Sequence, residues 1–271
     1  MKTSEAHPRT LWRDSSALAG TRLLAEETAV AISYNGSTHV VLMASPSDLE
    51  DLAVGFSVTE GIVDDLAAIE SITIEEYAQG LDVQVRVRED VADRLAKRRR
   101  NMAGPVGCGM CGLESLEAAA RCVPPVTATA RFSNADILEA ARALEGQQVL
   151  NKATSATHAA GFFRPDAALS LVREDVGRHN ALDKLIGALL RAGETCSAGG
   201  IIVTSRVSVE LVQKTALAGI GLIAAVSAPT ALAVRTAADC GLTLAAIVRG
   251  RSFECFTHPD RIKTDPCAHV A

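Results

Sequence analysis

The chain has 271 residues, a formal net charge of −5 and seven cysteines. The acidic balance excludes a protein that binds nucleic acid over its whole surface. No apolar run reaches the roughly 18 residues of a membrane helix, and the first residues contain no hydrophobic signal core, so we expect a cytoplasmic protein, not bound to a membrane, with mostly reduced thiols.

The first half of the chain has the pattern of an antiparallel β region with helices. Asn35-Gly36 lies between two β-rich runs and is a strong signal for a type I′ hairpin turn. Ser47 and Glu50 predict a capping box at the start of a helix, and Gly61 predicts its end. The expected elements are, in order, a flexible N-terminus (1–20), strands (28–34, 37–44), a helix (47–60), strands (71–77, 82–88), a helix (90–101) and, after a loop, another helix (113–122).

The second half alternates helices and strands. The expected order is helix 133–146, strand 167–175, helix 178–193, strand 199–205, helix 207–219, strand 221–227, helix 230–241, strand 242–250 and edge strand 252–258. This alternation is typical of an α/β fold with a largely parallel sheet flanked by helices. The sequence "VPPV" at 123–126 interrupts the pattern. It separates an expected β-rich subdomain over 21–125 from an expected α/β nucleotide- or cofactor-binding subdomain over 126–271.

Two cysteines, Cys108 and Cys111, lie among four glycines in "GPVGCGMCG". The glycines predict a mobile loop. A helix starting near Leu113 and the basic run Lys97–Arg100 both favour the thiolate, the nucleophilic form of cysteine. The basic run itself fits either a solvated helix end or a cationic collar for an anion or an acidic partner.

The spacing of these two cysteines fits three kinds of site: half of a zinc site, a redox or sulfur-transfer pair, and an inert buried pair. A structural zinc needs four ligands, and the chain has no second CxxC. The zinc deaminase signature also requires an H-x-E before the cysteines, which this sequence lacks. We therefore expect no metal.

Polar side chains gather where predicted strands pass into turns and helices, the usual place for ligands in such sheets. Lys184 is expected to meet a phosphate, and Asp183 to accept hydrogen bonds from a guanine edge. Ordinary helix capping with a solvated charge pair explains the same spacing. The candidate residues are Thr157, His158, Arg178, His179, Asn180, Asp183, Lys184, Ser205 and Arg206.

The chain resembles a known family, the formate dehydrogenase accessory sulfurtransferases (FdhD), over about residues 27–262. The resemblance rests on the motifs "LAVGFSVTEGIV", "CGMCG", "THAAGFF", "REDVGRHNALDK", "TSRVSVELVQK" and "FTHPDRI". It implies that Cys108 is the persulfide cysteine and Cys111 its partner. It also implies cofactor binding by Phe253, Glu254, Cys255, Phe256, Thr257 and His258. Phe256 stands where many relatives carry Tyr, so it keeps a stacking face and loses a hydroxyl.

The resemblance also implies a function and a fold. The family takes sulfur from a cysteine desulfurase as a persulfide. It passes the sulfur to the molybdenum or tungsten of a bis(molybdopterin guanine dinucleotide) cofactor that formate dehydrogenase needs. The implied fold resembles cytidine deaminases without their zinc. Two nucleotide halves favour a homodimer, and GDP should partly mimic the cofactor. The competing interpretations are a cofactor-binding chaperone without sulfur chemistry and a zinc-dependent nucleobase deaminase.

Overall fold

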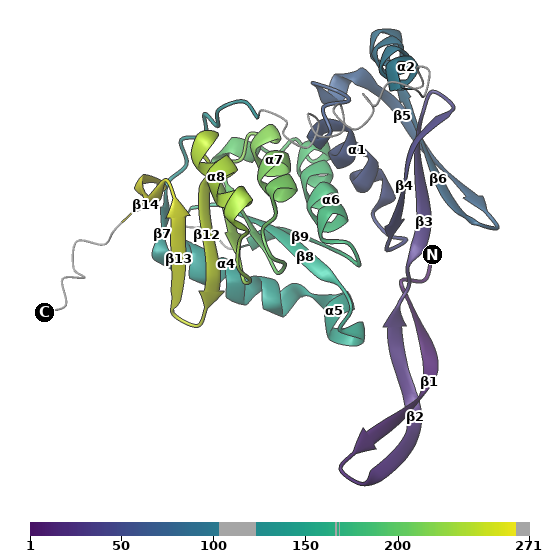
Figure 1. Ribbon diagram of the computed structural model, residues 1–271, viewed down its shortest axis with the longest axis vertical. Helices are drawn as coiled ribbons and strands as arrows, with labels where there is room; N and C mark the ends of the chain where they lie inside the picture. Colours follow the sequence, from purple (N-terminus) through teal and green to yellow (C-terminus); the bar gives the residue numbers. More distant parts are fainter. Residues whose placement is uncertain (103–122, 166, 168, 264–271) are drawn as a thin grey trace, which may run out of the picture.

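The computed structural model describes residues 1–102, 123–165, 167 and 169–263, with the side chains of 97–102 left out (Figure 1). Cys108, Cys111 and the helix expected at 113–122 lie outside the described residues, as do the side chains of Lys97–Arg100. The α/β fold class is confirmed, because helices flank the larger of the sheets. The likeness to cytidine deaminases stays a prediction.

A long hairpin projects from the rest of the molecule at the N-terminus (Figure 1). Strands β1 (Ser4–Arg13) and β2 (Ser16–Ala25) pair antiparallel over their whole length, from Ser4 opposite Ala25 to Arg13 opposite Ser16. The expectation of a flexible segment over 1–20 is therefore corrected. Apolar and polar side chains do not alternate regularly in these residues, so the sequence pattern does not indicate strands there. The strands are defined by the pairing of their backbones.

A four-stranded sheet follows, in the order β4-β3-β6-β5. Its strands are β3 (Thr28–Tyr34), β4 (Ser37–Ala44), β5 (Ile69–Tyr77) and β6 (Gly80–Val87). Asn35 and Gly36 have φ of 46° and 80°, which confirms the predicted hairpin turn. The expected antiparallel region is corrected at its centre, where β3 and β6 run parallel. The 3-10 helix η1 (Leu66–Ala68) and helix α2 (Glu89–Met102) flank β5 and β6 in the chain.

Helix α1 (Leu49–Thr59) packs on this sheet. The predicted capping box is wrong: Asp48 is the N-cap in a left-handed conformation (φ 51°), and the described structure shows no side-chain cap. The carboxylate of Asp48 instead lies 3.6 Å from Arg173. The predicted helix end is confirmed by Gly61, whose φ is 62°.

The larger sheet has six strands in the order β13-β12-β11-β10-β8-β9. Among the described residues, β10, β11 and β12 run parallel, whereas β8, β9 and β13 join antiparallel. The expectation of a largely parallel sheet therefore holds only at the centre. The strands are β8 (His158–Phe163), β9 (Leu169–Asp175), β10 (Gly200–Val203), β11 (Leu222–Ala225), β12 (Thr243–Arg249) and β13 (Ser252–Thr257).

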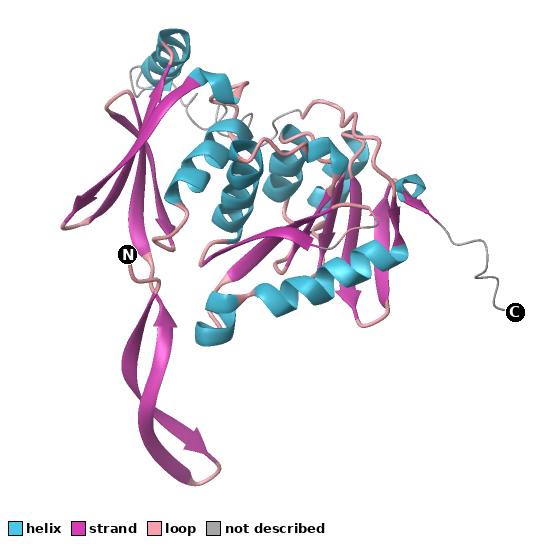
Figure 2. Ribbon diagram, turned by 180° about the vertical axis from the view of Figure 1, so that it is seen from behind, coloured by secondary structure: helices cyan, strands magenta, loops and turns pink. Residues whose placement is uncertain are grey.

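Helices cover both faces of this sheet (Figure 2). Alternate residues of each central strand enter different cores: Ile201 packs against α6 and α7, and Ile202 packs against α4. The capping box that begins α4 joins Ser133 and Asp136. The helices are α4 (Asn134–Gln147), α5 (Val149–Thr154), α6 (Arg178–Arg191), α7 (Val209–Leu217) and α8 (Ala231–Asp239). The short elements are η2 (Cys196–Ala198), η3 (Pro259–Arg261), β7 (Phe132–Ser133) and β14 (Ile262–Lys263).

Helices α1 and α6 approach each other backbone to backbone. A Cβ atom added at Gly55 would lie 1.8 Å from the carbonyl oxygen of Asp183, and one at Gly187 would lie 1.9 Å from that of Asp51. Each helix thus contributes one glycine that admits the backbone of the other. This crossing joins the two sheets, because α1 packs on the first and α6 on the second.

We predict that Gly55→Ala lowers the free energy of unfolding by about 2–3 kcal/mol or more, because the new methyl group must push α1 and α6 apart. Urea unfolding of the purified variant measures this loss. Gly146→Ala in α4 is the matched control, since a Cβ there meets no described atom within 4 Å. The control should be neutral or more stable by about 0.5–1 kcal/mol. Equal stability of Gly55→Ala and the wild type would contradict the close crossing.

Candidate functional site

Three polar turns meet at one edge of the larger sheet. His158 begins β8 and lies opposite Asp175, which ends β9. The backbone N–H of Thr204 donates to the carbonyl of Ala159 (3.1 Å), and the Ala159 N–H donates to Oγ1 of Thr204 (3.0 Å). The predicted residues near 157, 178 and 205 therefore share the edge at which the parallel strands end, the usual position of a ligand in such a sheet.

Positive charge and donors gather at this edge around Arg178. Burial lowers the pKa of His158, and the nearby Arg178 guanidinium lowers it further. The pKa of His179 is lowered by the same two causes in the same order. Within the described structure, Nε of Arg178 is buried without a hydrogen-bond partner. An anion bound at this edge would supply that partner.

A bulge in β12 shapes the same edge. The register between β12 and β13 shifts after Ala246, and Ile247 adopts a φ of 55°. A β-branched residue in this left-handed region costs about 1–3 kcal/mol. The Ile247 N–H donates to the carbonyl of Ser227 (3.2 Å), just beyond β11. The strained backbone conformation at Ile247 thus allows a hydrogen bond that fixes the ends of β11 and β12 relative to each other.

Lys184 does not face a ligand at this edge, although the sequence led us to expect it. Its side chain is fully buried, and Nζ lies 2.6 Å from Asp175 and 2.9 Å from the carbonyl of Ser45. Asn180 is also buried and donates to Asp175 (3.0 Å) and to the carbonyl of Met43 (2.8 Å). The expected contact of Lys184 with a phosphate is corrected: the ammonium neutralises a buried carboxylate and ties α6 to the end of β4.

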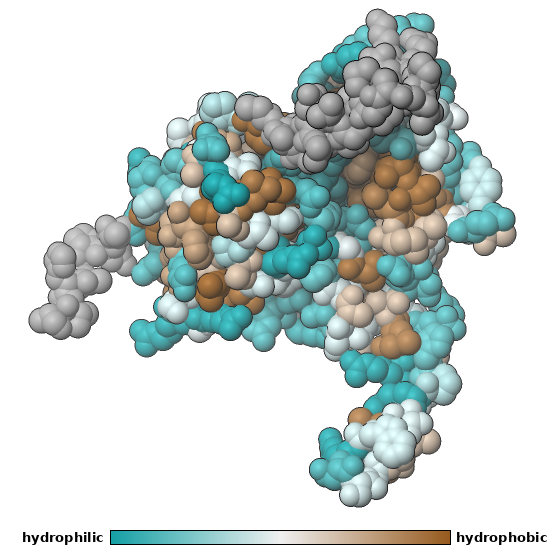
Figure 3. Space-filling view, in the orientation of Figure 1, coloured by the Kyte–Doolittle hydropathy of each residue, from teal (hydrophilic) through white to brown (hydrophobic). Residues whose placement is uncertain are grey.

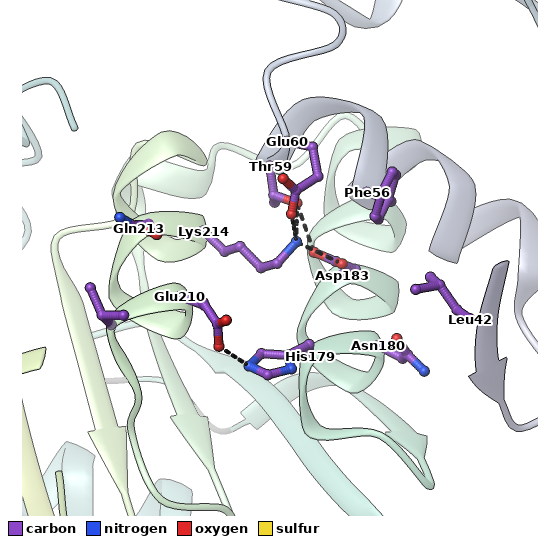
Figure 4. Close-up of a pocket in the computed structure, with 11 residues that line it drawn as sticks. Leu42, Phe56, Thr59, Glu60, His179, Asn180, Asp183, Glu210, Gln213 and Lys214 are labelled. Carbon is purple, nitrogen blue, oxygen red and sulfur yellow. Dashed lines mark hydrogen bonds and ion pairs between the residues drawn. The ribbon is translucent and has the colours of Figure 1, made fainter. Parts of the chain in front are cut away.

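Asp183 is similarly engaged. Its two carboxylate oxygens accept hydrogen bonds from Thr59 (2.8 Å) and from Lys214 (3.0 Å), and Lys214 also donates to Glu60 (2.7 Å) (Figure 4). Burial opposes the charged form of Lys214, but the carboxylates of Asp183 and Glu60 outweigh it and raise its pKa. Asp183 is therefore occupied, so the expectation that it reads a guanine edge is corrected.

A cavity of about 350 Å³ opens beside this network, between α1, α6 and α7 (Figure 4). Nε2 of His179 lies 2.8 Å from Glu210 at its wall. The carboxylates of Glu60 and Glu210 are 38% and 57% exposed, so both remain accessible from solvent. Lys214 and Glu210 escaped the sequence analysis. The signal that could have indicated Lys214 was its position in an amphipathic helix, three residues after the buried Leu211 and therefore on the same face.

A second cavity, of about 540 Å³, lies on the α4 side of the sheet at the ends of the central strands. Thr204, Val226 and Arg249 line it from the strand ends, and Arg142 lines it from α4. The sequence analysis missed both arginines because no motif surrounds them. The strand ends are thus flanked by a cavity on each side.

The remaining predicted residues are distributed differently. Ser205 Oγ donates to the carbonyl of the exposed Arg206 (3.0 Å), and Thr157 Oγ1 donates to Glu174 (3.2 Å). The segment Phe253–His258 starts near the strand-end edge but runs away from it: Ser252 pairs with Arg249, whereas Thr257 pairs with Leu244. Its last residues therefore lie at the opposite edge of the sheet.

Side chains in this segment differ in exposure. Phe253 packs against the core beside α4, and Thr257 is buried, where its hydroxyl donates to the carbonyl of Leu242 (2.6 Å). Glu254, Cys255 and Phe256 are exposed. His258 contacts the carbonyl of Ala238 through Nε2 (2.9 Å). The structure does not bring His258 together with His158 or His179.

Among the described residues, no group of three or more His, Cys, Asp or Glu side chains is placed to hold a metal. None of the helices in the described part is long and apolar enough to span a membrane. The expected absence of zinc stays a prediction, because Cys108 and Cys111 lie outside the part described.

We predict that Lys184→Met lowers the free energy of unfolding by about 3–5 kcal/mol, because it leaves the Asp175 carboxylate buried without its cation. Chemical denaturation at pH 7 checks the prediction. Arg86→Met is the control: Arg86 pairs with Glu70 at the surface (3.2 Å, side chains 75% and 48% exposed), so its loss should change stability by less than about 1 kcal/mol. Similar small losses from both variants would show that the buried pair adds little.

Comparisons with known proteins agree with one another. A family model described as the FdhD/NarQ family matches residues 25–263. The sulfur carrier protein FdhD of Agrobacterium fabrum is 54% identical over 255 residues, 94% of each chain. That of Cupriavidus necator is 48% identical over 93% of this chain and 88% of its own. A crystal structure of a formate dehydrogenase accessory protein from Desulfotalea psychrophila has a TM-score of 0.78 and 26% identity, over 97% of this chain and all of the other. The chain belongs to the FdhD/NarQ family.

Proposed function

We propose that this protein is a sulfur carrier in the maturation of formate dehydrogenase. It accepts persulfide sulfur from a cysteine desulfurase and transfers it to the molybdenum or tungsten of a bis(molybdopterin guanine dinucleotide) cofactor, its substrate. The names of the relatives, sulfur carrier protein and formate dehydrogenase accessory protein, support the role. The observation that carries the cofactor part is the unpartnered, buried Nε of Arg178, at the edge where three polar turns meet.

The residues at this edge fit an anionic nucleotide. Arg178 supplies a donor that lacks a partner in the described structure, and His158 and His179 lie in its field. A phosphate at the edge would favour the protonated histidines, which Arg178 now disfavours. The accessible carboxylates of Glu60 and Glu210 offer acceptors for the N–H groups of a guanine edge in the adjoining cavity. Asp183 and Lys184 hold the surrounding helices in place.

The sulfur chemistry belongs to Cys108 and Cys111. The Cys108 thiolate attacks the terminal sulfur of the desulfurase persulfide, which forms a Cys108 persulfide and releases the cysteine thiolate of the desulfurase. Transfer of that terminal sulfur, as a neutral sulfur atom, to the reduced metal of the substrate returns Cys108 to its thiolate, and the metal supplies the two electrons that convert the sulfur into a sulfido ligand. Cys111 stabilises or relays the sulfur. The protein is thus a sulfurtransferase rather than a zinc deaminase. It works in the cytoplasm as a homodimer, because its substrate has two nucleotide halves.

We expect Cys108→Ser to abolish sulfur loading by a cysteine desulfurase, because the hydroxyl is too weak a nucleophile to replace the thiolate. Labelling of persulfides followed by mass spectrometry measures the loading. Cys111→Ser should reduce activation of formate dehydrogenase while still accepting sulfur. Cys255→Ser, which removes an exposed thiol on β13, is the control and should load as the wild type does.

Persistence of wild-type loading in Cys108→Ser would reject Cys108 as the carrier. A wild-type protein that activates formate dehydrogenase yet never loads sulfur would favour a cofactor-binding chaperone instead.

GDP should raise the melting temperature more than ADP does, because a ligand of the native state stabilises it and adenine cannot donate the same hydrogen bonds to Glu60 and Glu210. Arg178→Met should weaken GDP binding about tenfold or more, the value of one charge-assisted hydrogen bond. Melting curves measure the shift that each nucleotide produces. Titration calorimetry measures the affinities of the wild type and of Arg178→Met for GDP and ADP. Arg94→Met is the control, since Arg94 is exposed and pairs with the exposed Asp64, and neither residue lines the two cavities. Equal affinities for GDP and ADP would remove guanine recognition from the proposal.

A further inference from the structure

The cavity of about 540 Å³ on the α4 side of the larger sheet takes no part in the guanine site proposed above. That site lies on the opposite face, where the first cavity opens between α1, α6 and α7. Helix α4 covers the face to which the second cavity belongs (Figure 2). The volume falls within the range of small-molecule sites, about 300–1,000 Å³. This second cavity is named the α4 cavity.

The bulge in β12 builds one wall of the α4 cavity. Ala245 packs into the core beneath α4, and the next two residues, Ala246 and Ile247, both pack into the core beneath α6 and α7. Alternation resumes at Val248, which therefore faces α4 and lines the cavity. Without the extra residue, Val248 would face the opposite side of the sheet. The strained backbone of Ile247 (φ 55°) thus shapes a cavity, as such strain commonly does at ligand sites.

A buried amide in the α4 cavity has an unused donor. Gln148 joins α4 to α5 and is only 8% exposed. Its Oε1 accepts a hydrogen bond from Asn151 (3.2 Å), whereas its Nε2 donates to no described residue. An amide nitrogen carries two N–H donors, and a buried donor without a partner costs free energy. Because Gln148 lines the cavity, a carbonyl group of a bound molecule would supply the missing acceptor.

Two guanidinium groups line the same cavity. Arg249 ends β12 and is exposed, and its guanidinium makes no hydrogen bond or ion pair with a described residue. Arg142 of α4 pairs with Glu139 (3.0 Å), but the two side chains are 58% and 61% exposed, so the pair is weak and an anion can compete for the arginine. In Figure 3 the surface at the turn after β12 is largely hydrophilic. This charge favours a phosphate.

Apolar walls lie between these polar groups. They come from α4 and from the strand ends, and the residues are Leu138, Ala141, Leu144, Val226 and Val248. Glu145, also on α4, adds a carboxylate that can accept hydrogen bonds from N–H groups. Apolar walls suit a flat ring, whose carbonyl and N–H groups would meet Gln148 and Glu145. The α4 cavity therefore has the features of a site for a flat, amide-bearing heterocycle with a phosphate.

We propose that the α4 cavity binds the phosphate-bearing pterin at the other end of the guanine dinucleotide, an inference that rests on the proposed function. Guanine and pterin share an amino-oxo-pyrimidine ring, so either ring carries the groups that Gln148 and Glu145 recognise. The first cavity, with its accessible carboxylates, is assigned to guanine. Arg178 lies at the strand-end edge, where β9 passes into α6.

One dinucleotide would therefore straddle the strand-end edge. Its guanine lies on the α6 side, and its pterin lies on the α4 side. Arg178 holds the phosphate next to the guanosine, and Arg249 holds the phosphate next to the pterin. The bulge in β12 serves both halves, because it fixes the strand ends and places Val248 beneath the pterin.

Binding of hydroxymethylpterin phosphate to the full chain tests the proposal, and the fluorescence anisotropy of the pterin measures it. Gln148→Leu and Arg249→Met should each weaken binding about tenfold or more, as loss of one hydrogen bond to a buried or charged group does. The matched controls are Gln147→Leu and Arg251→Met, which change exposed residues that do not line the cavity and should bind as the wild type does. Melting curves confirm that each variant is folded.

Removal of the phosphate separates the two parts of the site. Hydroxymethylpterin without its phosphate should bind more weakly than the phosphate ester. Arg249→Met should not weaken its binding further, whereas Gln148→Leu should. A general loss of structure would weaken the binding of both compounds in both variants. Equal effects of Arg249→Met on the two compounds would reject Arg249 as the phosphate contact.

Competition with GMP identifies the occupant of the α4 cavity. Saturating GMP should leave the anisotropy of the bound pterin phosphate unchanged, because guanosine and its phosphate lie on the other side of the strand-end edge. Displacement of the pterin phosphate by GMP would show that guanine occupies the α4 cavity and would overturn the proposal. Failure of the wild type to bind the pterin phosphate would overturn it as well.

Sulfur loading of the same samples separates this inference from the proposed function. A wild type that loads sulfur and binds GDP, but does not bind the pterin phosphate, rejects only the assignment of the α4 cavity. A wild type that binds the pterin phosphate but never loads sulfur rejects only the sulfur carrier.

Discussion

Helices α1 and α6 cross with their backbones within van der Waals contact at Gly55 and Gly187. Any side chain at either position would separate them, and the polar contacts around the crossing depend on that short distance. Asp51 of α1 receives hydrogen bonds from Arg173 (2.8 Å) and Arg191 (2.5 Å) of the second half of the chain. The crossing therefore fixes two sheets, each with its own apolar core, in one arrangement.

Buried charges complete the joint. Lys184, which pairs with Asp175, also donates to the carbonyl of Ser45, the residue just after β4. Asp183, which pairs with Lys214, also accepts a hydrogen bond from the hydroxyl of Thr59 in α1. Such pairs contribute little net stability compared with well-packed apolar groups, but they strongly penalise arrangements that leave one charge alone. They select a single alignment of α6 between the sheets. The cavity beside His179 exists because that alignment is held.

The strand-end edge combines two physical devices. The bulge at Ile247 fixes the ends of β11 and β12, and the pairing of β8 with β9 and β10 brings the turns at His158, Asp175 and Thr204 together. Arg178 begins α6 at this point, so the helix that carries the buried pairs also presents the unpartnered guanidinium nitrogen. Positioning of α6 and recognition of an anion are therefore linked through one element.

The sequence by itself determined most of the local structure. The Asn35-Gly36 turn, the alternation of strands and helices after residue 167 and the ends of helices at Gly61 and Gly193 follow from backbone preferences that act over a few residues, whereas helix α5 and strand β8 were not predicted. The same local patterns placed candidate residues at the strand ends, and the long motif around Arg178 indicated the family. These predictions hold in the folded protein because the conformation at each of these positions depends mainly on residues that are close in the chain.

Tertiary structure alone decided which of those residues face a ligand. Lys184 and Asp183 lie in a polar motif that looks solvated in sequence, yet their partners Ser45, Thr59 and Lys214 come from distant parts of the chain. The direction of each strand pair, the pairing of the N-terminal hairpin and the capping of α1 by Asp48 also depend on distant contacts. Burial and charge pairing are properties of three-dimensional neighbours, and sequence spacing within one helix cannot specify them.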